Sequence, residues 1–217
     1  MKKSIFLSFI LCLCLIACIP QQVMAQKQSR MEKLLRYLND NDADKWQKNR
    51  EKLDDETKAY YAEDLSLMDV LNDLWNGQSE QAATLYFGCY EKAAQSNFPG
   101  ICEGEKIPLS QIRDKADQSI INLLEASKDK IPFSRALLDS IHATEYPVDS
   151  AMLQRLQNIR EVALLEGMLK TPTPIIYQTY VKEYPNGKFI AQVNASENVR
   201  LYQLVKTAPT QIGRAHV

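Results

Sequence analysis

Hydrophobic residues recur along most of this chain at intervals of three and four positions, the spacing that places them on one face of an α-helix. Alternation of period two, which would indicate strands, is nearly absent, so the pattern predicts an all-α fold of roughly eight or nine helices after residue 26. Trp75 completes one of these stripes and is expected to be substantially buried. The clearest stripes are Met31, Leu34, Leu35 and Leu38; Leu65, Met68, Leu71 and Trp75; Leu109, Ile112, Ala116, Ile120 and Leu124; and Leu153, Leu156, Ile159 and Ala163.

Turn signals divide the stripes into antiparallel helical hairpins. Gly77 interrupts the helical period in the middle of residues 56–96 and predicts two helices joined by a short connection. The pattern breaks again at Pro99 and Gly100, which predicts a loop and an internal boundary. The expected organisation is an N-terminal helical region over residues 26–96, a loop over 97–107, and a C-terminal helical region over 108–210.

The first twenty-five residues have the pattern of a bacterial export signal. Two lysines precede an apolar run from Ile5 to Ile19, which is shorter than the ~20 residues that a membrane-spanning helix needs. Val23-Met24-Ala25 fits ordinary signal peptidase, and we favour cleavage after Ala25. Leu15-Ile16-Ala17-Cys18 resembles a lipobox, in which Cys18 would be lipidated instead. We therefore expect an exported protein without a transmembrane helix in its mature chain, periplasmic or, with Cys18 acylated, an outer-membrane lipoprotein.

An aromatic-rich segment near the C-terminus, Tyr177-Gln-Thr-Tyr180-Val-Lys-Glu-Tyr184-Pro185-Asn-Gly187-Lys-Phe189, carries a family resemblance. It resembles the turn between the helices of tetratricopeptide-like repeats in bacterial envelope proteins, over about residues 170–210. Gly187 stands where such repeats often have serine. The resemblance implies a helical hairpin over residues 174–206 within a tetratricopeptide-like or irregular α-solenoid.

A short internal sequence similarity supports the repeat interpretation. Leu169-Lys170-Thr171-Pro172-Thr173 is similar to Val205-Lys206-Thr207-Ala208-Pro209-Thr210, and the two prolines lie 37 residues apart. That distance is close to the ~34-residue period of helical repeats. The hairpin over 174–206 carries more apolar residues than one helix pair can bury, so we expect its last helix to leave an apolar strip exposed.

The final residues have a different character. Ile212-Gly213-Arg214-Ala215-His216-Val217 resembles the translation of a widely used sequencing adapter. We therefore expect residues 211–217 to be a non-native tail without functional weight. On this interpretation the native chain continues beyond Thr210.

The amino-acid composition excludes some classes of protein function. The chain is 45% hydrophobic and 24% charged with a net charge of -1, which fits a folded domain and excludes a disordered acidic or basic tail. No cluster of basic residues interleaved with aromatics indicates nucleic-acid binding. Cys89 and Cys102 follow the export signal, and two alternatives remain open for them: a disulfide, which an oxidising periplasm permits, or a buried Cys89 with a loose Cys102.

Other candidate sites have simpler structural interpretations. Asp139-Ser140-Ile141 and Asp149-Ser150-Ala151 resemble the acceptor motif of periplasmic O-glycosylation at Ser140 and Ser150, although a helix beginning at Asp149 is favoured. His142 is expected at a helix C-terminus facing water. Asp40, Asp42 and Asp44 alternate as in a calcium loop but lack its glycine turn and closing glutamate, so a solvated helix connection is expected.

No catalytic constellation, cofactor motif or metal cluster is evident in the sequence. We therefore expect a non-catalytic, exported cell-envelope protein of the helical-repeat type that binds or scaffolds a protein or peptide partner. The alternative is the helical N-terminal module of a larger envelope enzyme or cell-wall-binding protein whose working domain follows Thr210.

Overall fold

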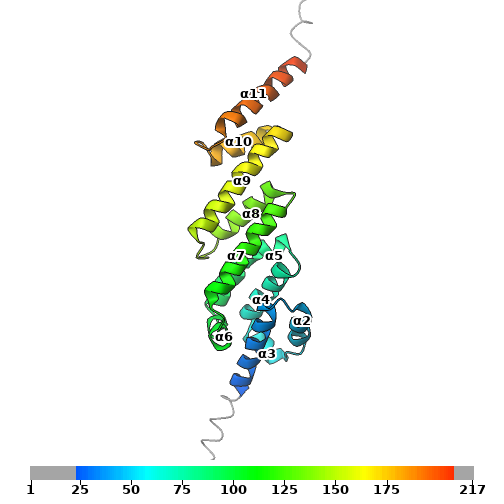
Figure 1. The fold of residues 1–217 in the computed structure, drawn as a ribbon, viewed down its shortest axis with the longest axis vertical. Coiled ribbons are helices and arrows are strands. Elements are labelled where there is room, and N and C mark those ends of the chain that lie inside the picture. The colour runs from blue at the N-terminus through cyan, green and yellow to red at the C-terminus, as the bar shows by residue number, and fades with distance from the viewer. Residues whose placement is uncertain (1–22, 208–217) are drawn as a thin grey trace, which may run out of the picture. The chain divides into compact units, whose positions relative to one another are not determined.

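The computed structural model describes residues 23–207, and within this range every regular element is helical (Figure 1). The predicted all-α fold is confirmed. These residues form eleven helices, more than the eight or nine expected, because several short helices such as α3 and α6 carry little periodicity. The helices span 23–39, α2 (Ala43–Glu51), α3 (Asp55–Tyr60), α4 (Ala62–Trp75), α5 (Glu80–Ala94), α6 (Phe98–Glu105), α7 (Leu109–Ala126), α8 (Lys130–His142), α9 (Ser150–Lys170), α10 (Pro174–Glu183) and α11 (Ile190–Thr207).

The chain divides into two compact units at a place that the sequence did not indicate. Unit 1 comprises the chain up to Leu123 together with Ser140–Pro147, and unit 2 comprises Leu124–Asp139 and the chain from Val148. The division falls within α7 and α8 rather than at residues 97–107. Continuous helices that contribute to two units give no Pro or Gly signal at the boundary, which explains why composition placed it elsewhere.

The antiparallel pair predicted over residues 56–96 is confirmed as α4 and α5, which pack side by side in unit 1. Ser79 caps α5 by accepting a hydrogen bond of 3.2 Å from the backbone N–H of Ala82. Leu65, Met68 and Leu71 are buried, as their spacing predicts. The helix over 23–39 likewise buries the stripe that begins at Met31.

Both tryptophans of the chain lie in unit 1. Trp75 is half-buried rather than fully enclosed, and the Lys115 ammonium lies 3.9 Å from the centroid of its ring. Leu74, one position before Trp75, is the residue that completes the buried face of α4. Trp46, which no stripe singled out, is 3% exposed on α2. The expected face of α4 is therefore correct in direction but rotated slightly at its end.

The loop expected over residues 97–107 is wrong, because the segment forms α6. Pro99 lies in the first turn of this helix, where no backbone N–H is needed. Phe98, Ile101 and Cys102 are buried at helical spacing, and Lys106 ends the helix in the left-handed conformation with φ 59°. Burial of this apolar face outweighs the local preference of proline and glycine for a turn.

Aromatic side chains form a buried cluster in unit 1. Tyr146 contacts the rings of Tyr86, Phe87 and Tyr90 edge-on, with centroids 4.9–5.6 Å apart. Its hydroxyl donates a hydrogen bond to the carboxylate of Asp117. Burial raises the pKa of Tyr146 far above its ordinary range, so this hydroxyl stays protonated as a donor. The cluster anchors the segment after α8 to unit 1.

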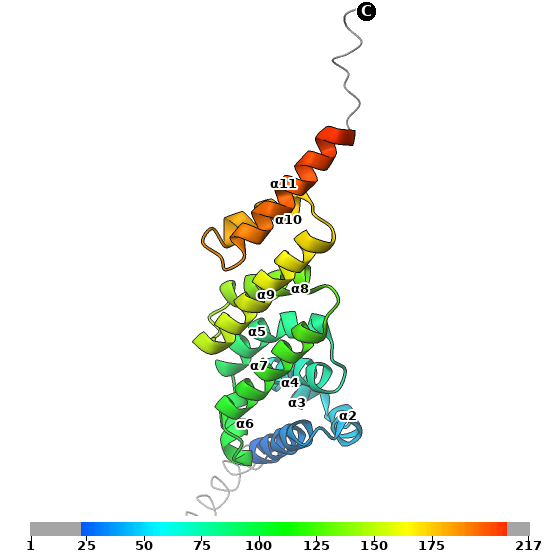
Figure 2. The same ribbon diagram turned by 45° about the horizontal axis from the view of Figure 1, so that its top comes forward.

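Unit 2 contains the predicted hairpin. α10 and α11 pack against each other and both pack against α9, an arrangement that Figures 1 and 2 show from two directions. Thr173 caps α10 by accepting from the backbone N–H of Ile176, and Pro174 occupies the first turn. The buried centre of the three helices is formed by Leu164, Met168, Tyr180 and Val193.

Within residues 23–207, none of the helices is both long enough and apolar enough to cross a membrane. Cys18 and residues 211–217 lie outside the described part of the chain. Ala25 lies at the beginning of the helix over 23–39.

Candidate functional site

The turn between α10 and α11 is fixed to α9 through one carboxylate. Glu161 on α9 accepts a hydrogen bond of 2.8 Å from the Tyr180 hydroxyl and one of 2.7 Å from the backbone N–H of Lys188. The same hydroxyl accepts from the backbone N–H of Phe189 at 3.1 Å. Burial, with the hydrogen bond to Glu161, raises the pKa of Tyr180 to about 12, so it remains a donor at neutral pH.

Gly187 is required by the closeness of this turn. A Cβ atom at this position would lie 2.5 Å from the Glu161 carboxylate, 2.5 Å from the Tyr180 hydroxyl and 2.8 Å from Tyr184 Cβ. The φ angle of Gly187 is not positive, so the restriction is steric and not conformational. This explains why glycine occupies this position of the turn.

A buried arginine connects α8, α9 and α10. Arg160 is 2% exposed, and its guanidinium donates to both carboxylate oxygens of Glu183 at 2.6 and 2.9 Å. It also donates to the Ile131 carbonyl at 2.7 Å and the Ser134 hydroxyl at 3.1 Å. Burial acts to raise the pKa of Glu183, but the hydrogen bonds and charges of Arg160 and Arg135 outweigh it and lower that pKa below 4.5. Unit 2 is thus held rigidly by charged groups as well as by its apolar centre.

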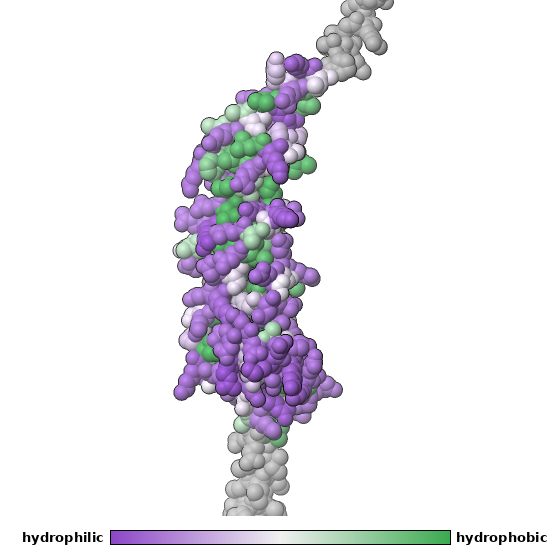
Figure 3. Space-filling model, turned by 45° about the vertical axis from the view of Figure 1, so that its right-hand side comes forward, coloured by the Kyte–Doolittle hydropathy of each residue, from purple (hydrophilic) through white to green (hydrophobic). Residues whose placement is uncertain are grey.

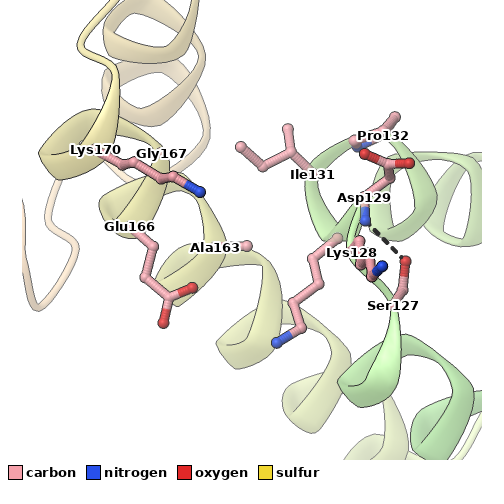
Figure 4. Close-up of a pocket in the computed structure, with 10 residues that line it drawn as sticks. Ser127, Lys128, Asp129, Ile131, Pro132, Ala163, Glu166, Gly167 and Lys170 are labelled. Atoms are coloured by element: carbon pink, nitrogen blue, oxygen red, sulfur yellow. Dashed lines mark hydrogen bonds between the residues drawn. The ribbon is translucent and has the colours of Figure 1, made fainter.

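A shallow cleft of about 280 Å³ lies in unit 2 between α9 and the turn that joins α7 to α8 (Figure 4). Lys128 contributes from the turn, Lys130 is the first residue of α8, and Glu166 and Lys170 contribute from α9. The Ser127 hydroxyl accepts a hydrogen bond of 3.0 Å from the backbone N–H of Asp129. With Asp129, three lysines and two carboxylates line this cleft, so their charges largely cancel and it offers no concentrated field for one charged ligand.

The most distinctive surface of unit 2 is an apolar stretch on α11, which we name the α11 face. Its five large side chains are 45–78% exposed, whereas Val193, earlier in the same helix, is buried against α9 and α10. Figure 3 shows apolar side chains (green) gathered over unit 2, while the visible surface of unit 1 is mostly hydrophilic (purple). The exposed apolar strip expected on the last helix is confirmed. The α11 face consists of Val199, Leu201, Tyr202, Leu204 and Val205.

The two cysteines are free thiols in this structure. Cys102 is buried on α6, and burial raises its pKa to about 12. Cys89 is half-buried on α5, with its Sγ 3.5 Å from the Ser66 hydroxyl. No disulfide joins Cys89 and Cys102 in this structure. The alternative without a bridge was a buried Cys89 and a loose Cys102, and the structure shows the reverse. Cys102 is buried because its segment forms the helix α6, which packs this side chain inward.

The remaining candidate residues lie apart from one another along the chain. Ser140 is half-buried within α8, and Ser150 is exposed as the first residue of α9. Asp149 caps α9 through the backbone N–H of Ala151, which is the helix start that the sequence favoured. O-glycosylation of either serine stays a prediction. His142 is exposed at the C-terminal end of α8, as expected.

The acidic run from Asn39 to Asp44 forms the connection between the first helix and α2. Asn41 adopts a left-handed conformation with φ 56°, and Asp42 caps α2 by accepting from the backbone N–H of Lys45. Within residues 23–207 no group of three or more His, Cys, Asp or Glu side chains is arranged to hold a metal ion. The expected helix connection is what the structure places here.

Sequence reasoning missed Arg160 and Glu161, the two charged residues around which unit 2 is organised. The position of Arg160 in the helical pattern could have indicated its burial. Arg160 lies four residues after Leu156 and four before Leu164, so it occupies the apolar face of α9. A charged residue in such a position needs a buried partner. That partner, Glu183, lies 23 positions away and cannot be identified from local spacing.

Comparison with known proteins identifies no relative: no family model, curated protein or solved structure matches this chain.

Proposed function

We propose that this chain is an exported, non-catalytic binding or scaffold protein of the cell envelope, and that unit 2 docks a protein partner on the α11 face. The exposed α11 face is the observation that carries the proposal. Five large apolar side chains lie exposed within about two turns of one helix. Exposed apolar surface of this kind marks interaction sites. The leader over residues 1–25 supports export, because its charged start, short apolar run and small-residue end match a signal sequence.

The chemistry of unit 2 supports binding rather than catalysis. Its most buried charged groups, Arg160 and Glu161, are engaged in hydrogen bonds that hold the helices together. The cleft beside α9 brings lysines and carboxylates to its rim, but its described lining pairs no nucleophile with a general base. These groups organise a rigid support, and the α11 face is the surface that this support presents.

Site-specific photo-crosslinking in cells of the native host tests this function. A photoreactive phenylalanine analogue replaces Tyr202, which is 69% exposed in the α11 face. The same analogue replaces Tyr60 as the matched control, since this tyrosine is 49% exposed on α3 in unit 1. We expect a discrete adduct with one envelope protein from position 202 and not from position 60, and loss of the adduct when Leu204→Glu is added.

Two results would contradict the proposed function. The first is the absence of any adduct from position 202 although the protein is exported and folded. The second is the same set of adducts from both positions, which would show unspecific contact. The alternative, an N-terminal module of a larger envelope enzyme, predicts a catalytic domain encoded directly downstream, and sequencing of the gene beyond the codon for Thr210 decides it.

A further inference from the structure

We propose that Asn186 is a site of spontaneous covalent modification, at which the loss of ammonia through a ring formed with Gly187 converts the asparagine to aspartate and isoaspartate. Water is the only other reactant. The modification is separate from the proposed docking function, and its products weaken the turn that joins α10 to α11.

The reaction follows from the order of the two residues, asparagine and then glycine. The main-chain nitrogen of Gly187 attacks the side-chain carbonyl carbon, Cγ, of Asn186, and glycine has no Cβ that would hinder this intramolecular attack. A bond forms between the nitrogen and Cγ, the bond from Cγ to Nδ2 breaks, and ammonia leaves with the proton of the Gly187 N–H. Water then opens the ring. Cleavage between the nitrogen and Cγ gives aspartate, and cleavage between the nitrogen and the main-chain carbonyl carbon gives isoaspartate.

The structure leaves the Asn186 side chain free to react. The segment 184–187 forms a type I turn, in which the Gly187 N–H donates to the Tyr184 carbonyl at 2.9 Å and the two central residues lack positive φ. Asn186 is exposed, and its side-chain amide makes no hydrogen bond within residues 23–207. The amide can therefore rotate toward the Gly187 nitrogen when the one hydrogen bond of the turn opens.

The chain has one other Asn-Gly pair, Asn76-Gly77 at the end of α4, and there both reacting groups are held. The Asn76 amide donates to the side chain of Asn72 at 3.0 Å. The Gly77 N–H donates to the Asp73 carbonyl at 3.1 Å, which continues the hydrogen-bond pattern of the helix. Attack at this pair requires both bonds to open, so we expect Asn186 to react severalfold faster.

Aspartate at position 186 adds a negative charge beside the carboxylate that fixes the turn. A carboxyl group at this exposed position is ionised at neutral pH. It would adjoin Gly187, where a Cβ atom would lie 2.5 Å from the Glu161 carboxylate. The two negative charges repel each other, but water screens a charge on an exposed side chain. Aspartate is therefore the product with the smaller effect.

Isoaspartate has the larger effect, because it adds one carbon atom to the main chain of the turn. The longer main chain displaces Gly187 from its close contact with Glu161 and Tyr180. The backbone N–H of Lys188 then loses its bond of 2.7 Å to Glu161. The backbone N–H of Phe189 loses its bond of 3.1 Å to the Tyr180 hydroxyl. Both bonds hold the segment that leads into α11, so we expect the modified chain to unfold at a lower urea concentration.

Incubation of the purified chain at mildly alkaline pH tests the site. Isoelectric focusing separates the more acidic products, and mass spectrometry of tryptic peptides locates the change. Methylation by an isoaspartyl methyltransferase measures the isoaspartate. We expect the first acidic product to carry the change at position 186. Asn186→Gln should remove this product, since glutamine would have to close a larger ring, and Asn76→Gln, at an equally exposed asparagine, should leave it.

Urea denaturation followed by circular dichroism tests the consequence. The product with isoaspartate at position 186, separated by ion exchange, should have a lower urea midpoint than the unmodified chain. Asn186→Asp supplies the charge without the added carbon atom, so its midpoint should fall by a smaller amount.

Three outcomes would overturn the proposal. The first is reaction at Asn76 before position 186. The second is an unreacted position 186 in the folded chain after a synthetic peptide of residues 182–190 has been converted. The third is an equal urea midpoint for the isoaspartate form and the unmodified chain. None of these measurements involves a binding partner, so their failure leaves the docking function standing, and failure of photo-crosslinking from position 202 leaves the modification site standing.

Discussion

Replacing Gly187 by alanine tests the geometry of unit 2 most directly. Two effects act on the free energy of unfolding in opposite directions, so the sign of the measured change shows which effect is larger. The added methyl group would lie 2.5 Å from both the Glu161 carboxylate and the Tyr180 hydroxyl. Against this, alanine restricts the unfolded chain, which favours folding by about 0.4–1 kcal/mol where the native backbone accepts it. The φ angle of Gly187 is not positive, so this gain is available in full.

The steric effect is the larger of the two. Glu161 has to move away from the methyl group, and losing one of its two hydrogen bonds costs about 1.5–3 kcal/mol because the acceptor is charged. Strain in the surrounding side chains adds about 1–3 kcal/mol. After subtraction of the entropic gain, Gly187→Ala is expected to lower the free energy of unfolding by about 1.5–5.5 kcal/mol.

Urea denaturation followed by circular dichroism measures this change. Gly100→Ala is the matched control: Gly100 also lies in a described segment with negative φ, but nothing lies within 4 Å of a Cβ atom built there. Because Gly100 is inside α6, alanine is expected to stabilise unit 1 by up to about 1 kcal/mol. An unchanged or increased stability of Gly187→Ala, with Gly100→Ala behaving as expected, would refute the steric argument.

Three further predictions concern charges and thiols. Arg160→Leu is expected to lower the free energy of unfolding, measured in urea, by about 3–5 kcal/mol, since Glu183 loses its buried partner; no loss would mean that the pair is dispensable. The pKa of Glu183 is lowered in the folded state, so its contribution is present above its ordinary pKa of 4.5 and is lost as the pH falls through the folded value. The urea midpoint of the unaltered chain should therefore drop more steeply below pH 4.5 than that of Glu183→Gln, and parallel curves would contradict this. At pH 8 iodoacetamide should modify Cys89 at least about tenfold faster than Cys102, whose pKa burial raises to about 12; equal rates by mass spectrometry would contradict the burial of Cys102.

The helical fold was predictable because each amphipathic stripe is a local property of the sequence. Leu65, Met68 and Leu71 lie within two turns of α4, so their spacing alone indicates which side is buried. The hairpin turn at Gly187 was recognisable for the same reason. α6 was not, since Pro99 and Gly100 are typical turn residues and only the packing of Phe98 against the rest of unit 1 favours a helix.

The organisation of unit 2 depends on contacts distant in sequence and could not be predicted from spacing. Arg160 reaches Ile131 and Glu183, which lie more than twenty positions away in opposite directions. Its helix, α9, is enclosed on several sides by α8, α10 and α11. The polar residues of α9 therefore do not gather on one face, and their spacing does not indicate which side of the helix is buried. The α11 face was predictable, since it follows from counting the apolar residues that one hairpin can bury.

The position of the two tryptophans gives the molecule a built-in reporter. Trp46 and Trp75 both belong to unit 1, and the sequence has no other tryptophan, so indole fluorescence follows the unfolding of that unit alone. Circular dichroism follows the helices of both units. For a variant such as Gly187→Ala, coincidence of the two signals in urea would identify a single cooperative transition, and an earlier change in ellipticity would identify unit 2 as an independently melting segment.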